Sequence, residues 1–243
     1  MRMEIDAILF SASAGEMSYY FSHLDQIEVL SMDNKLEYFL GFHENKKIIL
    51  THTGLGKVQA AAVFNTSYQY FAPKMAVFTG LAGAVDRSLE IGDLIIGKKC
   101  IDADLLGIHE ALVNTPFEDF LQHRHEAGEI PKEYFADDRL VKLAMGNLDY
   151  FTRSGCLASS DNFPSPSEKI KMLRIMGVSS MDMESACFYH MAEIFKIPAL
   201  AIRAISNKLD LFGEDDDLED ADLEGAEKAA DIALDLVENF FIK

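Results

Sequence analysis

Residues 180–210 read Ser-Met-Asp-Met-Glu-Ser-Ala-Cys-Phe-Tyr-His-Met-Ala-Glu-Ile-Phe-Lys-Ile-Pro-Ala-Leu-Ala-Ile-Arg-Ala-Ile-Ser-Asn-Lys-Leu-Asp. The pattern predicts a strand over 178–183, a helix after it, and a second strand over 199–205 beyond Pro198, which breaks the helix. We expect the two strands to run parallel, as in a β-α-β unit. Open α/β sheets bind ligands at the carboxyl ends of parallel strands, so a ligand site is expected there. The positions at helical spacing are Ala186, Tyr189, His190 and Ile194.

Polar side chains gather at the ends of both predicted strands. A buried sheet segment with hydrogen-bonded polar ends is the simpler interpretation, and a binding site is the other. The polar residues are Asp182, Glu184, Arg203, Ser206 and Asn207.

Two motifs in this region, Met181-Asp-Met-Glu-Ser-Ala and Arg203-Ala-Ile-Ser-Asn, resemble the purine nucleoside phosphorylase and hydrolase superfamily. The resemblance points to its methylthioadenosine/S-adenosylhomocysteine nucleosidases and futalosine hydrolases. It implies an α/β fold of three layers, α/β/α, with a mixed central sheet. Further segments agree in the same order along the chain: Ala14-Gly-Glu-Met, Gly54-Leu-Gly-Lys-Val-Gln-Ala-Ala, Thr79-Gly-Leu-Ala-Gly-Ala, Ile91-Gly-Asp, Asp102-Ala-Asp and Ser159-Ser-Asp-Asn-Phe.

Composition favours one globular domain over residues 1–243, since no linker, repeat or low-complexity stretch interrupts the chain. No apolar run reaches the roughly 20 residues of a membrane span, and the N-terminus carries acids, so a cytoplasmic protein is expected. The net charge of −18 disfavours nucleic acid and anionic membranes as partners. The cysteines are predicted to be buried thiols: Cys100, Cys156 and Cys187.

Neither of two candidate metal segments predicts a cofactor. The acidic run 214–222 lacks the ligand spacing of a calcium loop and is expected to be a solvated loop. His123-Arg-His125 has no carboxylate and histidine set at helical spacing beside it and is expected on a surface loop. No metal and no organic cofactor is therefore implied.

The remaining pattern predicts alternating strands and helices. Asp137 is expected to cap the helix that follows it. The expected strands are 5–11, a hairpin of 36–42 and 48–53, 75–79 leading into a glycine-bearing turn at 80–84, 94–97, and one ending at 157–160. The expected helices are 58–71, 137–148, 167–176 and 223–241.

The resemblance assigns chemistry to two acids. Breaking a purine N-glycosidic bond needs a carboxylate that activates water, a grip on the ribose, and a donor at the purine edge. Glu16 matches the family's general base, whereas an acid in a first helical turn is the structural alternative. Glu184 matches the acid that accepts hydrogen bonds from the two vicinal ribose hydroxyls, since a carboxylate offers two acceptor oxygens.

Other positions match the family's sugar and base contacts. Met183 matches an apolar wall under the sugar, and Phe163 an aromatic ring that stacks on the purine. Ala82 and Gly83 lie where the family brings backbone close to the nucleoside. Arg203 matches an arginine that orders the catalytic water or the acidic cluster, with a buried structural ion pair as the alternative.

Two departures from the family pattern concern the base. Asn207 stands where the methylthioadenosine nucleosidases carry an aspartic acid; its amide donates to N7 or O6 of a purine but supplies no titrating proton. Pro164 stands where relatives direct a backbone N–H at adenine N1, and proline has none. Both changes favour a 6-oxopurine such as hypoxanthine over adenine.

The attacking group is expected to be water. A phosphorylase needs an anion site, usually built with arginines, but neither 11–24 nor 75–86 contains Arg or Lys. Gly54-Leu-Gly-Lys lacks the spacing of a phosphate loop and is interpreted as a place of close helix–strand packing. Leu81 replaces a small hydroxyl residue of the family, which removes one polar contact near the water.

The prediction is a purine nucleoside N-ribosyl hydrolase, futalosine-type, acting on a hypoxanthine nucleoside of menaquinone biosynthesis. One alternative is a methylthioadenosine/S-adenosylhomocysteine or aminofutalosine nucleosidase. The other is a nucleoside-binding protein without catalysis, which Leu81 and Asn207 together suggest. The resemblance also implies a homodimer, with 105–129 facing the second subunit.

Overall fold

A computed structural model describes residues 2–32, 36–105, 133–147, 149–163, 165–209 and 223–242. Pro164, the histidines at 109, 123 and 125, and the acidic run 214–222 lie outside these ranges. The strands are β1 (Met3–Ser11), β2 (Asp25–Ser31), β3 (Glu37–His43), β4 (Lys46–His52), β5 (Phe71–Ala84), β6 (Leu94–Asp102), β7 (Tyr134–Phe135), β8 (Thr152–Ser159), β9 (Val178–Asp182) and β10 (Ala199–Lys208). The helices are α1 (Ser18–His23), α2 (Lys57–Tyr70), α5 (Asp138–Met145), α6 (Ser167–Ile175), α7 (Ser185–Phe195) and α8 (Leu223–Asn239).

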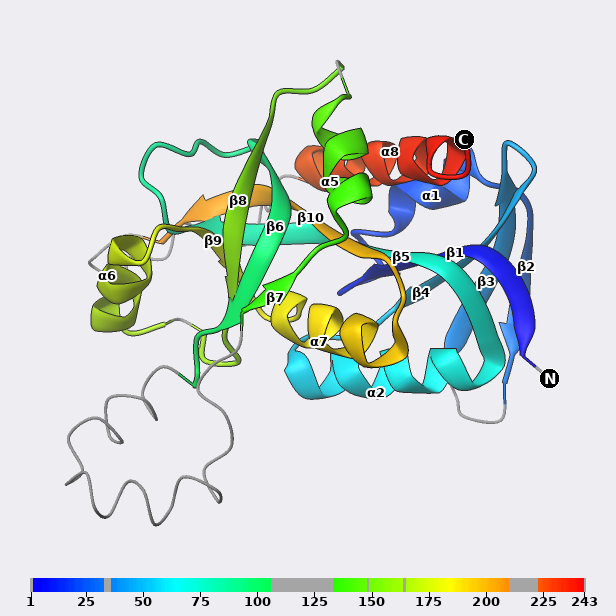
Figure 1. Ribbon diagram of the computed structural model, residues 1–243, viewed down its shortest axis with the longest axis horizontal. Coiled ribbons are helices and arrows are strands. Elements are labelled where there is room, and N and C mark those ends of the chain that lie inside the picture. The colour runs from blue at the N-terminus through cyan, green and yellow to red at the C-terminus, as the bar shows by residue number, and fades with distance from the viewer. Residues whose placement is uncertain are drawn as a thin grey trace, which may run out of the picture.

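The described strands form one mixed sheet that closes on itself at one end. Its order is β10-β6-β8-β9-β5-β1-β4-β3-β2, with β7 beside β6. An additional pairing joins β10 to β5, so β5, β10, β6, β8 and β9 make a closed ring of strands. Strands β1 to β4 extend the sheet away from this ring, as the ribbon in Figure 1 shows.

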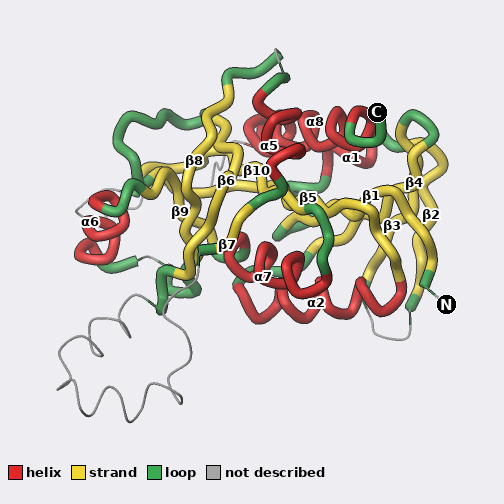
Figure 2. The backbone as a smooth tube through the Cα atoms, in the orientation of Figure 1, coloured by secondary structure: helices red, strands yellow, loops and turns green. Residues whose placement is uncertain are grey.

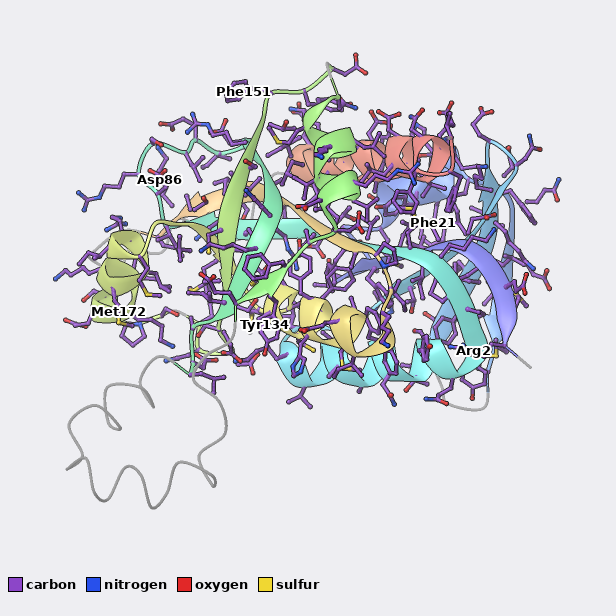
Figure 3. The ribbon with its side chains drawn as sticks, in the orientation of Figure 1. Arg2, Phe21, Asp86, Tyr134, Phe151 and Met172 are labelled. Atoms are coloured by element: carbon purple, nitrogen blue, oxygen red, sulfur yellow. The ribbon has the colours of Figure 1, made fainter. Side chains whose placement is uncertain are left out.

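Helices cover both faces of the sheet. Helices α2 and α7 lie together on one face, and α1, α5 and α8 lie on the other (Figures 1 and 2). Each face has its own apolar core. On one face, Phe10 of β1 packs with Phe64 of α2 and Phe188 of α7. The core on the other face includes Leu9 of β1 and Val237 of α8. Tyr134 of β7 reaches α7, where its ring stacks on His190 at 4.9 Å between centroids (Figure 3). The predicted three-layer α/β/α arrangement with a mixed sheet is confirmed.

Most predicted elements occur within a few residues of their expected bounds. Asp137 caps α5 as predicted, accepting hydrogen bonds from the backbone N–H groups of Arg139 and Leu140. Two of the cysteines are buried, while Cys187 is half-buried. Among the described helices, none is long and apolar enough to cross a membrane.

Two expectations about local structure were wrong. Strands β9 and β10 do not run parallel, because both pair with β5 but β9 is antiparallel to it and β10 is parallel. The expected turn at 80–84 is strand, because each of these residues pairs with β10.

Candidate functional site

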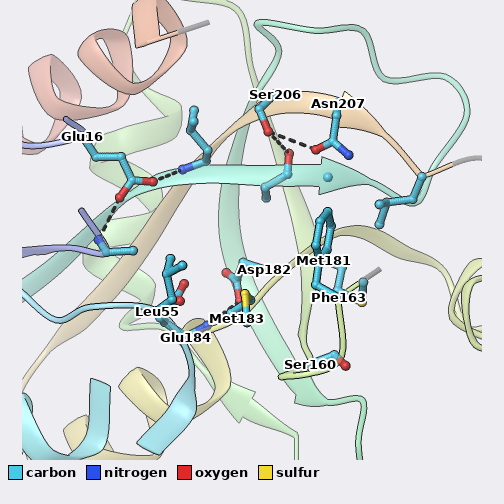
Figure 4. A pocket seen from close by; sticks show the side chains of 15 residues that line it. Glu16, Leu55, Ser160, Phe163, Met181, Asp182, Met183, Glu184, Ser206 and Asn207 are labelled. Atoms are coloured by element: carbon cyan, nitrogen blue, oxygen red, sulfur yellow. Dashed lines mark hydrogen bonds between the residues drawn. The ribbon is translucent and has the colours of Figure 1, made fainter. Parts of the chain in front are cut away.

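A cavity of about 310 Å³ opens where the closed ring of strands meets the loops after β1, β4 and β8 (Figure 4). Most of the residues predicted from the sequence line it, although they come from five separate segments of the chain. Pro164 lies outside the described residues. Arg203 does not line the cavity but lies behind the side chains that form its wall. The lining residues are Ala12, Glu16, Leu55, Leu81, Ala82, Gly83, Ser160, Phe163, Met181, Asp182, Met183, Glu184, Ser206, Asn207 and Leu209.

Glu16 is fixed in one orientation by backbone donors. It is 7% exposed and follows β1 in a turn just before α1. Its Oε2 accepts hydrogen bonds from the N–H groups of Ala12 (2.8 Å) and Ser13 (3.0 Å), and its Oε1 accepts one from Leu81 (2.9 Å). A carboxylate offers about four acceptor positions, so this one retains capacity for a further donor from the cavity.

Gly80 permits a close approach of Glu16 and Arg203. A Cβ atom at this position would lie 2.6 Å from Oε1 of Glu16 and 2.8 Å from Nη1 of Arg203. These separations are shorter than any non-bonded carbon contact, so only glycine fits between the two charged groups. Gly80 is not among the site residues predicted from the sequence, although it lies in the same glycine-bearing segment as Ala82 and Gly83.

Arg203 is fully buried at the back of the cavity. Its Nε lies 2.8 Å from Oδ2 of Asp182, its Nη2 lies 3.6 Å from Oε2 of Glu184, and its guanidinium carbon lies 4.4 Å from the centre of the Phe78 ring. Burial alone would lower the pKa of Arg203, but the nearby carboxylates outweigh burial and raise it. Among the described groups, Nη1 and Nη2 have no hydrogen-bond acceptor, so both remain able to donate.

Glu184 stands at the start of α7 and is 3% exposed. Its Oε1 accepts a hydrogen bond of 2.9 Å from the N–H of Gly56, at the start of α2. Burial raises the pKa of Glu184 to about 7, while the Arg203 guanidinium and the Gly56 N–H act in the opposite direction. The expected role of Gly54-Leu-Gly56 as a packing element is therefore incomplete, because this segment also donates directly to a cavity acid.

Asp182 anchors the wall beneath these groups. One of its oxygens accepts hydrogen bonds from Ser159 Oγ (2.6 Å) and from the N–H groups of Glu184 (3.1 Å) and Ser185 (3.0 Å). Its other oxygen binds Arg203 and the hydroxyl of Ser185. Asp182 therefore orients the start of α7 and holds Arg203 in place.

An irregularity in β10 turns Ser206 and Asn207 toward the same cavity. Neighbouring side chains of a regular strand point to opposite faces, but the register between β5 and β10 shifts between Ile205 and Asn207. The hydroxyl of Ser206 donates to Oδ1 of Asn207 at 3.0 Å. Both residues were predicted at this strand end, but the register shift has no signal in the sequence.

The remaining predicted residues supply apolar surface. Phe163 and Met183 both line the cavity, and Phe163 is 44% exposed. Ala82 and Gly83 line it from β5, as predicted, but a Cβ at Gly83 would lie 2.8 Å from the side chain of Leu209. Glycine at 83 therefore also makes room for Leu209, which the sequence analysis did not consider.

A half-buried ion-pair network holds the loop that carries Phe163. Asp104 binds Lys57 (2.8 Å) and Lys169 (2.7 Å) and accepts hydrogen bonds from the Ser160 hydroxyl (2.6 Å) and the Asp161 N–H (2.8 Å). Burial alone would raise the pKa of Asp104, but Lys169, Lys57 and the hydrogen bonds lower it. The Asp102-Ala-Asp104 motif therefore acts through this loop rather than in the cavity, where it supplies no lining residue.

The described part of the chain offers no group of three or more His, Cys, Asp and Glu side chains placed to hold a metal ion. The chemical groups of the cavity are instead the three carboxylates of Glu16, Asp182 and Glu184, with a guanidinium behind them, an amide and apolar walls. Such a set can bind hydroxyl groups, orient a water molecule and hold a flat polar ring.

Comparisons with known proteins agree with this arrangement. The family model for the phosphorylase superfamily matches residues 6–241. A methylthioadenosine/S-adenosylhomocysteine nucleosidase from Staphylococcus carnosus is 31% identical, over 71% of this chain and 73% of the relative. An aminodeoxyfutalosine nucleosidase from Campylobacter jejuni is 28% identical, over 81% of this chain and 85% of the relative.

A solved structure of futalosine hydrolase from Helicobacter pylori has the same fold. It superposes with a TM-score of 0.75 at 19% identity, covering 97% of both chains. The predicted superfamily, its nucleosidase branch, and an enzyme of the type that cleaves N-glycosidic bonds are confirmed by these matches. The chain belongs to the phosphorylase superfamily.

Proposed function

We propose that this protein is a purine nucleoside N-ribosyl hydrolase that prefers a hypoxanthine nucleoside of the futalosine type. One observation carries the proposal: the buried carboxylates of Glu16 and Glu184 line the same cavity as Asn207. Arg203 lies behind the wall, close to both acids. The names of the relatives support hydrolysis of an N-glycosidic bond.

In this proposal Glu16 holds and activates the attacking water. The three backbone N–H groups keep its carboxylate in place, so one acceptor position faces the cavity. Arg203 lies behind the wall, and in this proposal it orders the acidic cluster, since its guanidinium binds Asp182 and lies 3.6 Å from Glu184. The water attacks the anomeric carbon and its proton passes to Glu16. The bond to the purine nitrogen breaks with its electron pair on the purine, where hydrogen bonds donated by the Asn207 amide stabilise the charge.

Glu184 is proposed to hold the ribose. Its Oε1 is already bound to Gly56 and its Oε2 faces Arg203, so the carboxylate is oriented before the sugar arrives. Two vicinal hydroxyls donate to it, and Met183 covers the sugar from one side. Because the carboxylate must be ionised to accept from both hydroxyls, its raised pKa makes binding sensitive to pH.

Nucleoside affinity should therefore fall about tenfold for each pH unit below about 7, since Glu184 must release its proton to bind the ribose. Titration calorimetry with a non-hydrolysable nucleoside analogue between pH 5 and 8 measures this, with the free base as a ligand that lacks the ribose. Glu184→Gln should bind the nucleoside weakly with a flat profile. A wild-type profile as flat as that of Glu184→Gln would contradict the ribose role.

Asn207 and Phe163 are proposed to hold the purine. The Phe163 ring stacks on the base, and the Asn207 amide donates to N7 and O6 of a 6-oxopurine. Pro164 has no N–H and can only accept a hydrogen bond. The N1–H of hypoxanthine can donate to such an acceptor, whereas N1 of adenine needs a donor that proline lacks.

Asn207 should give a preference for hypoxanthine over adenine nucleosides of about 5- to 150-fold in kcat/KM, because an unmade buried hydrogen bond costs about 1 to 3 kcal/mol. Asn207→Asp should shrink or invert the ratio, since an ionised aspartate repels O6 and a protonated one serves adenine N7. Initial rates on futalosine and aminofutalosine, which differ only in the base, measure it. Equal wild-type rates on the pair would contradict the base assignment.

Water rather than phosphate is the proposed nucleophile. The described residues that line the cavity include no lysine or arginine. Arg203, behind the wall, already binds Asp182 and Glu184. An entering phosphate would meet the carboxylates of Glu16, Asp182 and Glu184, whose negative charge opposes it.

Two alternatives are separable by one experiment. The 31% identical relative favours a methylthioadenosine/S-adenosylhomocysteine nucleosidase, whereas Leu81 at the water site favours a binding protein without turnover. Inosine, futalosine, aminofutalosine, methylthioadenosine and adenosylhomocysteine are each incubated with the protein, with and without phosphate, and free base is assayed. We expect phosphate-independent release, fastest from futalosine. Formation of a sugar 1-phosphate would contradict hydrolysis, and thermal stabilisation without base release would indicate a binder.

A further inference from the structure

The irregularity in β10 gives Ser206 a position that a regular strand would not allow. Because the register shifts between Ile205 and Asn207, the side chains of Ser206 and Asn207 both line the cavity. Adjacent residues rarely bond through their side chains in a strand, since these point to opposite faces. Here the hydroxyl of Ser206 reaches the amide of its own neighbour.

The contact distinguishes the two ends of the Asn207 amide. Ser206 Oγ lies 3.0 Å from Oδ1 of Asn207 and 3.5 Å from the carbonyl oxygen of Ala82. In Figure 4 the amide oxygen lies toward Ser206 and the nitrogen lies on the opposite side. An amide group offers an acceptor at one end and two donors at the other, so its orientation decides which kind of partner it presents.

The reversed amide is less favourable for a specific reason. With Nδ2 turned toward Ser206, the hydroxyl would have to accept that hydrogen bond and give its only proton to Ala82. That carbonyl lies at 3.5 Å, the outer limit of hydrogen bonding, whereas Oδ1 lies at 3.0 Å. The hydroxyl therefore favours the orientation in which Oδ1 is occupied and Nδ2 is free to donate.

We infer that Ser206 is a positioning residue for base selection: it orients the Asn207 amide so that Nδ2 donates to the substrate. This inference rests on the proposed function and adds the residue that decides the base. The oriented amide matches a purine edge made of two acceptors, as in a 6-oxopurine. The reversed amide would place Oδ1 against a 6-amino group and would suit adenine.

Ser206→Ala removes the hydroxyl, and Ser206→Thr retains it as the matched control. Nucleoside pairs with the same 5′ group, inosine with adenosine and futalosine with aminofutalosine, give the ratio of kcat/KM values. One hydrogen bond contributes about 0.5 to 1.5 kcal/mol, so Ser206→Ala should lower the hypoxanthine-to-adenine ratio about 2- to 10-fold. Ser206→Thr should leave the ratio unchanged, and circular dichroism verifies that both variants fold.

The outcomes separate this inference from the proposed function. A wild-type preference for hypoxanthine that survives unchanged in Ser206→Ala, or equal losses on both bases, overturns the role of Ser206 alone. A wild type that releases no base from any nucleoside overturns the hydrolase proposal instead. Calorimetry with hypoxanthine and adenine then answers the same question without turnover, because the ratio of the two Kd values should also fall in Ser206→Ala. An unchanged ratio, or no binding of either base by the wild type, overturns the inference.

Discussion

Glu16→Gln should reduce kcat by about 100-fold or more while the protein still binds nucleoside. The amide of glutamine cannot take the proton of the attacking water, and general-base catalysis typically contributes about 10²- to 10⁴-fold. The groups that we propose to hold the substrate, Glu184, Phe163 and Asn207, remain in place. Single-turnover kinetics and calorimetry with a nucleoside analogue measure rate and affinity separately.

The substitution also has a structural cost that the experiment must take into account. Both carboxylate oxygens of Glu16 accept backbone N–H groups, from Ala12 and Ser13 at one oxygen and from Leu81 at the other. Glutamine has a single acceptor oxygen, so one of these donors faces an NH₂ group, at a cost of about 1 to 3 kcal/mol. Urea unfolding of Glu16→Gln should report this loss.

Glu4→Gln is the matched control, because Glu4 is an exposed acid on the same strand, β1, that leads to Glu16. It should leave kcat, affinity and stability unchanged. A folded Glu16→Gln protein that binds nucleoside and retains wild-type kcat would assign the base role to another group.

The sequence was sufficient to predict what depends on local pattern and on motif. Apolar periodicity located β1, β4 and α8, and the acid at Asp137 marked the start of α5. The motifs around Glu184 and Arg203 predicted that distant segments meet, and the cavity brings them together. These features depend on a few neighbouring residues, which a single sequence displays.

Features that depend on strand pairing could not be predicted. The antiparallel run of β9 against β5 follows from ring closure through β10, which involves residues more than 100 positions apart. The contact between Gly56 and Glu184 joins two loops that have no shared pattern. The register shift at Ser206 has no compositional mark either, although it decides which way Ser206 and Asn207 point.

Arg203→Met should lower the free energy of unfolding by about 3 to 5 kcal/mol near pH 8, because it leaves buried carboxylates without their cation. Arg203 is fully buried, binds Asp182 at 2.8 Å and lies 3.6 Å from Glu184. Methionine retains the apolar stem but loses the contact of the guanidinium with the Phe78 ring, so most of the loss should be electrostatic. Urea unfolding at several pH values measures it.

The loss of stability in Arg203→Met should grow as the pH rises, because Glu184 then ionises. Its pKa in the folded protein is about 7, above the ordinary value of 4.5, so its stabilising contribution is complete below about 4.5 and lost as pH rises through 7. Without Arg203, which lowers that pKa, it should rise further, and ionising Glu184 becomes costlier in the folded state. Near pH 5.5 both proteins hold Glu184 protonated, and the difference between them should be smaller.

The double variant Arg203→Met with Glu184→Gln tests the same cause. Neutral glutamine needs no cation, so the double variant should recover stability relative to Arg203→Met at pH 8 and should show a weaker pH dependence. Asp182 keeps its hydrogen bonds from Ser159 and from the backbone of Glu184 and Ser185, so its share of the loss should remain. A loss that is equal at pH 5.5 and 8, and equal with and without Glu184→Gln, would mean that Arg203 stabilises the fold through packing rather than through its charge.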